Sequence, residues 1–151
     1  MNIGESLPRN AQHFPGKPAI VDAQRTVCYR ELHERTSSLA NYLLSQGIGK
    51  GDLVGLSCGS RAEHFEALFA IAKIGAVAAP FDFNWSEQES EAMLRFFGPK
   101  AFLLELRHET EGLAEIVGEI VRPPNLLVIN PRNDDCTQHG GRRPGRTEAS
   151  S

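Results

Sequence analysis

Apolar residues follow two patterns that alternate along most of the chain. Short continuous apolar runs predict buried strands, and these runs cover residues 53–58, 77–83, 101–104 and 126–129. Between the runs, apolar residues recur with the period of a helix that has one buried face. Strands covered on both faces read as continuous apolar runs, so this order predicts an α/β fold with a mostly parallel sheet and helices on its faces.

Capping signals mark the ends of the predicted helices. The first helix begins near Arg30 and ends at Gly47, a residue type that commonly terminates helices. Residues 60–63 and 86–89 have the Ser-x-x-Glu pattern of a capping box, and the helix after the second box ends at Gly98. The buried faces predicted for the four helices are Leu32, Leu39, Ala40, Leu43 and Leu44; Phe65, Leu68, Phe69 and Ala72; Met93, Leu94 and Phe97; and Leu113, Ile116, Val117, Ile120 and Val121.

The two ends of the chain differ from this alternating region. A polar lead precedes residues 17–21 and 26–29, which read as two short extended pieces joined by a turn and predict a hairpin. Residues 131–151 have almost nothing to bury, so we expect one domain over residues 1–130 and a disordered tail over residues 131–151. A frame change followed by a stop would also produce such a tail, a hypothesis that the encoding DNA can test.

Composition excludes several classes of function. The chain has 151 residues, a length sufficient for one hydrophobic core. Its formal net charge of -3 gives no indication of a basic face that would bind nucleic acid. Three cysteines, Cys28, Cys58 and Cys136, form no Cys-x-x-Cys pair, which indicates free thiols, and the scattered histidines predict no metal cluster. Without a leader-like or membrane-spanning segment, the expected location is cytoplasmic.

Arginines concentrate near the end of the chain, at Arg142, Arg143 and Arg146. Three arginines among glycine and proline are usually a solvated tail, and we expect no nucleic-acid partner. Three glycines, Gly47, Gly49 and Gly51, resemble a dinucleotide-binding glycine motif, but they end a helix and lead into a strand. We therefore interpret them as turn residues.

Two strand ends carry candidate chemistry. Residues 57–60 end a strand and begin a helix, a common place for ligand contact in α/β folds, and Cys58 would be a nucleophile if His64 served as its base. The competing interpretation is helix capping and a buried structural thiol. Asp82 and Asn84 end the next strand, where they are either an acid, base or metal ligand or, as we expect, turn formers. We assign no residue as catalytic, cofactor-binding or metal-binding.

Several sequence motifs, in the same order along the chain, resemble those of the acyl-adenylate-forming (AMP-binding) ligase family. They are FPGKPAIV from Phe14, the helix and Gly-Asp-x-Val-like segment over residues 28–56, and the stretch from Ser60 to Asn84 that ends in Pro-Phe-Asp-Phe-Asn. Cys28 departs from the Thr or Ser that usually caps this helix, a change that costs about 1 kcal/mol. The resemblance implies the N-terminal part of the large domain of an acyl-CoA synthetase, similar to long-chain fatty acid–CoA ligases.

This resemblance also implies what the chain lacks. The family's phosphate loop and later nucleotide motifs lie beyond this region, so no site residue can be carried over and we expect no cofactor to be bound by this chain. In the family, the complete enzyme uses ATP and Mg²⁺ to adenylate a carboxylic acid, of which fatty acids are one class, and passes the acyl group to CoA.

Two functional interpretations remain open. The first is the N-terminal part of an acyl-CoA ligase that is inactive alone. The second is a stand-alone α/β binding or interaction module, such as one piece of a split ligase, that binds a protein partner or itself through exposed apolar surface.

Overall fold

A four-stranded parallel sheet forms the centre of the molecule. The computed structural model describes residues 3–23, 25–59, 62–82, 84–105, 110–121 and 125–129. The strands of the sheet have the order β4-β3-β5-β6, and every neighbouring pair is parallel. They are β3 (Leu53–Ser57), β4 (Val77–Pro80), β5 (Ala101–Glu105) and β6 (Leu126–Ile129). The predicted α/β class and parallel sheet are therefore confirmed.

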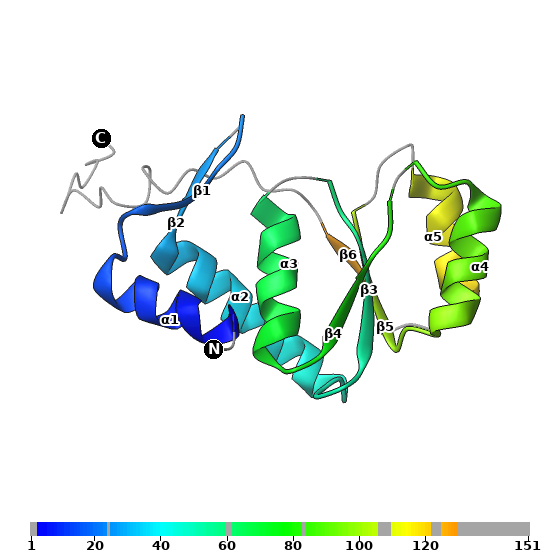
Figure 1. The fold of residues 1–151 in the computed structure, drawn as a ribbon, viewed down its shortest axis with the longest axis horizontal. Coiled ribbons are helices and arrows are strands. Elements are labelled where there is room, and N and C mark those ends of the chain that lie inside the picture. The colour runs from blue at the N-terminus through cyan, green and yellow to red at the C-terminus, as the bar shows by residue number, and fades with distance from the viewer. Residues whose placement is uncertain are drawn as a thin grey trace, which may run out of the picture.

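Helices cover both faces of the sheet (Figure 1). On one face lie α2 (Tyr29–Ser45) and α3 (Ala62–Lys73), and on the other lie α4 (Glu87–Phe97) and α5 (Glu111–Ile120). Each face has its own core. The α2/α3 face is packed by Leu43, Ile48, Val54, Leu56, Cys58, Ala67, Ile71, Ala101 and Leu103. The α4/α5 face is packed by Phe81, Leu94, Phe102, Leu104, Leu113, Val117 and Val121.

A small N-terminal layer lies beyond α2 and α3. The antiparallel hairpin of β1 (Pro18–Val21) and β2 (Thr26–Cys28) confirms the predicted hairpin. No element was predicted for the polar lead, most of which forms α1 (Ile3–His13), a helix that packs against α2 and α3. Leu7 is the buried residue of α1, and Pro8 interrupts its hydrogen bonding, so neither a repeated apolar stripe nor helix propensity marked it.

A buried ion pair joins the hairpin to α3. Arg25, in the turn region before β2, pairs with Glu63 in the first turn of α3, and both side chains are almost completely buried. Glu63 was predicted to belong to a capping box with Ser60, but Ser60 lies outside the described residues. The observed partner of Glu63 is thus a distant arginine that fixes the hairpin against the start of α3.

Two predicted helix faces need correction. Leu44 of α2 is 51% exposed and Phe65 of α3 is 45% exposed, so neither belongs to the buried core. The buried face of α3 is made by Ala67, Ala70 and Ile71 instead. Small alanines let α3 approach its neighbours closely, and this rotates the larger Phe65 toward an apolar hollow beside α1.

The shorter helix α4 also buries less than predicted. Leu94 is fully buried, whereas Met93 and Phe97 are exposed. The cap prediction for this helix is confirmed, because the Glu89 N–H donates to Ser86 Oγ at 3.2 Å and the Ser86 N–H donates to Glu89 Oε2 at 2.8 Å. Gly98 ends α4 in the left-handed conformation, as expected of a C-terminal glycine.

The glycines between α2 and β3 form turns, as predicted. Gly47 and Gly51 have φ of 78° and 83°, values that L side chains rarely adopt. The Gly49 N–H donates to Asp52 at 2.9 Å and the Lys100 ammonium lies 3.2 Å from the same carboxylate, and together these contacts lower the pKa of Asp52. The acidic side chain is therefore used to hold the turn closed.

Candidate functional site

The carboxyl ends of the parallel strands bring the candidate residues of the sequence to one edge. The connection after β3 leads to α3 on one face of the sheet, whereas those after β4 and β5 lead to α4 and α5 on the other face. Neighbouring strands whose connections leave in opposite directions open a crevice between them, which is where open α/β sheets commonly bind ligands. The crevice here lies at the ends of β3, β5 and the adjacent β4.

A buried carboxylate at the end of β5 holds the first wall of this crevice. Glu105 is 1% exposed, and its Oε2 accepts a hydrogen bond from the Gly59 N–H at 2.9 Å. The Cys58 thiol lies 3.3 Å from the same oxygen. The backbone carbonyl oxygen of Glu105 accepts a hydrogen bond from Thr110 Oγ1 at 2.8 Å. Glu105 thereby links the β3–α3 connection to the start of α5.

Sequence reasoning did not identify Glu105. In the sequence, Glu105 is only an acidic residue that follows the apolar run of β5. An acidic residue at that position commonly marks the point where a strand reaches solvent. The contact partners lie 46 and 47 residues earlier in the chain. The role of Glu105 therefore depends on the strand order, which no local pattern specifies.

Cys58 has the environment of a structural thiol. It is buried within the core on the α2/α3 face, and its described hydrogen bond is to the Glu105 carboxylate. A carboxylate is a poor activator of a thiol, because the reactive form is the anionic thiolate. The ring of His64, the residue considered as a base, contacts the Phe65 ring with centroids 5.8 Å apart. These contacts favour the structural interpretation of Cys58.

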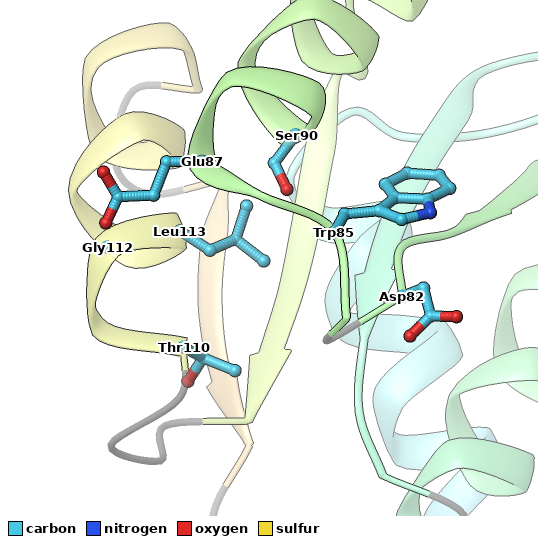
Figure 2. Close-up of a pocket in the computed structure, with 7 residues that line it drawn as sticks. All are labelled: Asp82, Trp85, Glu87, Ser90, Thr110, Gly112 and Leu113. Carbon is cyan, nitrogen blue, oxygen red and sulfur yellow. The ribbon is translucent and has the colours of Figure 1, made fainter.

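Asp82 and Asn84 form a turn after β4, as predicted. Asp82 Oδ1 accepts hydrogen bonds from the Asn84 N–H at 2.9 Å and from Asn84 Nδ2 at 3.0 Å. The Trp85 N–H donates to the Asp82 carbonyl at 3.2 Å. This arrangement is an Asx-type turn, in which the side chain imitates a backbone turn. It places the Trp85 ring beside Asp82 at the mouth of the crevice (Figure 2).

Aromatic rings in edge-to-face contact support the Trp85 side chain. The Phe81 ring lies between Trp85, at a centroid distance of 5.4 Å, and Phe102 of β5, at 5.1 Å, both in edge-to-face geometry. Such pairs add about 0.5–1.5 kcal/mol beyond area burial. The Phe102 ring in turn lies directly over Gly55 of β3, where a Cβ atom would overlap it. The floor of the crevice is therefore closely packed and apolar.

Two hollows share Asp82 and Trp85. The larger, of about 420 Å³, opens on the β3 side and is lined by Cys58, Gly59, Pro80, Phe81, Asp82, Asn84 and Trp85. The smaller, of about 50 Å³, lies between the starts of α4 and α5 and is lined by Asp82, Trp85, Glu87, Ser90, Thr110, Gly112 and Leu113 (Figure 2). The charged residues among these described lining residues, Asp82 and Glu87, are acidic. A nucleotide phosphate placed there would need cations from elsewhere.

Glu87, one of these two acidic residues, has a structural role at the start of α5. Its carboxylate reaches from α4 to the first turn of α5, where a Cβ at Gly112 would overlap it (Figure 2). The N-cap residue of α5, Thr110, makes no side-chain cap bond and instead donates to Glu105. A negative charge near a helix N-terminus is favourable, so Glu87 complements a helix whose own cap is engaged elsewhere.

Other kinds of site find no support in the described part of the chain. No group of three or more His, Cys, Asp or Glu side chains there is placed to hold a metal ion. Within the same residues, no helix has both the length and the apolar character needed to cross a membrane. The predicted tail and Cys136 lie outside the described residues, as do His108 and His139.

Comparison with known proteins defines the class of the fold and then the family. The fold is that of the N-terminal subdomain of adenylate-forming enzymes. A putative long-chain-fatty-acid CoA ligase from Rhodopseudomonas palustris superimposes with a TM-score of 0.77 at 20% identity, over 95% of this chain and 37% of that one. A mutant form of coronafacic acid ligase from Pectobacterium brasiliense gives 0.78 at 20% identity, over 89% and 28%. The AMP-binding enzyme family model matches residues 7–144, and the chain belongs to that family.

A curated relative gives the scale of the match. The medium/long-chain-fatty-acid–CoA/3-oxocholest-4-en-26-oate–CoA ligase of Mycobacterium marinum is 29% identical over an alignment of 145 residues that covers 93% of this chain and 26% of the relative. The chain thus spans about a quarter of the length of this relative. The match to the family model also runs past residue 130, into the segment predicted to be a tail.

Proposed function

We propose that this chain is the N-terminal part of an acyl-CoA ligase and is not catalytic by itself. The complete enzyme would use ATP and Mg²⁺ to adenylate a carboxylic acid and would then transfer the acyl group to CoA. The observation that carries the proposal is the match of residues 7–144 to the AMP-binding family within a chain that spans about a quarter of its relative.

The charge of the crevice supports the proposal that this chain is not catalytic by itself. Adenylation requires positive charge or metal around the phosphates of ATP, because charge develops on their oxygens during transfer. The described residues that line the two hollows provide Asp82 and Glu87 and no lysine or arginine. We therefore infer that the cations and the metal ligands come from parts of the ligase beyond these hollows, and that the chain alone binds neither ATP nor CoA productively.

The relatives suggest a class of substrate. The Mycobacterium marinum relative is a ligase of medium- and long-chain fatty acids and of 3-oxocholest-4-en-26-oate. We propose that the parent ligase acts on a large apolar carboxylic acid of this kind, in fatty acid or related metabolism.

The encoding DNA tests the relation to a longer ligase. We expect the sequence beyond the codon for Ser151, translated in all forward frames or in a neighbouring gene, to encode a Ser/Thr/Gly-rich phosphate loop followed by the later adenylation motifs. DNA that encodes no such motifs would contradict the proposal and would favour a stand-alone interaction module.

A further inference from the structure

The hollow beside α1 is a second concave site, separate from the crevice. It has a volume of about 340 Å³ and lies between α1, β1, the start of α2 and α3. In Figure 1, α1 and the hairpin lie on the side of α2 and α3 that faces away from the sheet. The hollow shares no described lining residue with the crevice, so a ligand of one need not contact the other.

Apolar side chains from three helices form much of this hollow. Leu7 of α1 and Leu32 of α2 are buried members of a third apolar cluster, and Phe69 of α3 packs against that cluster. Phe65, one turn before Phe69, also lines the hollow but is 45% exposed. An apolar molecule bound here would remove part of the Phe65 ring from water, which is the main favourable contribution to binding in apolar pockets.

The size of the hollow favours a small molecule over a segment of protein. One turn of helix is about 10 Å across and about 5.4 Å long, which is more than the hollow can hold. A strand is narrower, but its backbone N–H and C=O groups would find few partners among apolar side chains. Small-molecule pockets have volumes of roughly 300–1,000 Å³, and an apolar cavity of about 150 Å³ is enough for benzene. The hollow therefore fits a molecule of about two fused rings.

The polar groups of the hollow are neutral. No charged side chain is among its described lining residues. Ser6 Oγ donates to the Ile3 carbonyl at 2.8 Å, which leaves its lone pairs available. Asn10 follows one turn later on α1, and its side-chain amide makes no hydrogen bond to another described residue. Burial of a charge without a partner is costly, so these groups suit a hydroxyl or carbonyl and not a carboxylate.

We propose that the hollow beside α1 binds a small neutral molecule that has an apolar two-ring body and one hydroxyl or carbonyl group. The rings pack against Phe65 and Phe69, and the Asn10 amide hydrogen-bonds the polar group. The proposal does not rest on the proposed ligase function, so either can fail alone.

Titration of the full 151-residue chain with 2-naphthol, followed by NMR of the backbone amides, tests this site. The probe is neutral and has two fused rings and one hydroxyl group. We expect saturable chemical-shift changes that are largest at Leu7, Ile20 and Phe65 and absent at Trp85 in the crevice. We expect 2-naphthoate, which has the same rings but a negative charge, to bind about tenfold more weakly or less.

Two matched substitutions test whether Phe65 forms part of the site. Phe65→Asp places a charge in the wall and should weaken 2-naphthol binding by about tenfold or more. The control is Phe97→Asp on α4, because Phe97 is also 45% exposed and does not line the hollow. This control should bind 2-naphthol as the wild type does. The comparison of the two probes needs no variant, so it still tests the site if Phe65→Asp fails to fold.

Any of four results would overturn the proposal. The first is no saturable binding of 2-naphthol by the wild-type chain, as expected if another part of the chain fills the hollow. The second is a set of shift changes that is largest at Trp85. The third is equal binding of the two probes, and the fourth is an equal effect of the two aspartates on binding.

Discussion

Glu105 shows how one buried side chain organises the edge of the sheet. Its carboxylate holds the Gly59 N–H after β3, and its backbone carbonyl holds Thr110 before α5. Residues from three elements therefore depend on one position. Burial of this carboxylate is tolerable only because its oxygen has partners, so loss of the side chain should be felt at Gly59 first.

Replacement of Glu105 by alanine should destabilise the chain by about 1–3 kcal/mol, because the buried Gly59 N–H would lose its acceptor. Denaturant unfolding measures the loss, and hydrogen exchange at Gly59 should accelerate. Glu119→Ala, at an exposed position on α5, is the matched control and should change stability by less than about 0.5 kcal/mol. Unchanged exchange at Gly59 in the Glu105 variant would show that this carboxylate does not hold the connection.

At the scale of elements, the sheet depends on one close approach between neighbouring strands. Gly55 of β3 lies under the Phe102 ring of β5, and that ring supports Phe81 and Trp85 at the mouth of the crevice. A glycine inside a strand normally weakens it, and such positions often mark sites where another group packs closely. The packing of this face is therefore tied to the absence of a side chain at residue 55.

Gly55→Ala should destabilise the chain by about 1–3 kcal/mol, since the new methyl group would overlap the Phe102 ring. The matched control is Gly118→Ala in α5, where nothing lies near the added Cβ, and it should stabilise by up to about 1 kcal/mol. Thermal and denaturant unfolding of the two variants gives the comparison. A combined Gly55→Ala and Phe102→Leu variant should recover part of the loss, and purely additive losses would contradict the overlap.

Element positions were predictable where the pattern was local. The four sheet strands and the Ser86 capping box have clear apolar runs and spacing, and the structure confirms them, except that the strand predicted over residues 77–83 ends at Pro80. Helix α1 was missed because it buries Leu7 as its main contact and contains Pro8. The face of α3 was misjudged because tertiary packing favoured its alanines over Phe65.

The candidate site was predictable only in part. The Asx-type turn at Asp82 and Asn84 is formed by neighbours in sequence, and the sequence predicted it. The contact of Glu105 with Gly59 and the stack of Phe81 on Phe102 require the strand order β4-β3-β5, which arises from long-range pairing. Hydrophobic periodicity carries no information about that order.

For the whole molecule, the charge of the crevice bears most directly on the proposed function. The crevice has a closely packed apolar floor, a hydrogen-bonded turn beside Trp85 and a buried carboxylate, and its described lining residues carry negative charge. Under the proposed function, the cations that neutralise the phosphates of ATP would come from segments beyond these hollows. Membership of the AMP-binding family and the capacity to catalyse adenylation are therefore separate properties of this chain.

The most direct test of this account is carboxylate-dependent ATP–pyrophosphate exchange by the purified chain, with Mg²⁺ and a panel of fatty, aromatic and steroid acids. The full-length Mycobacterium marinum relative serves as the positive control for the assay. We predict no exchange above the enzyme-free blank for this chain with any acid. Exchange that requires both the chain and a carboxylic acid would contradict the proposal that this chain is not catalytic by itself.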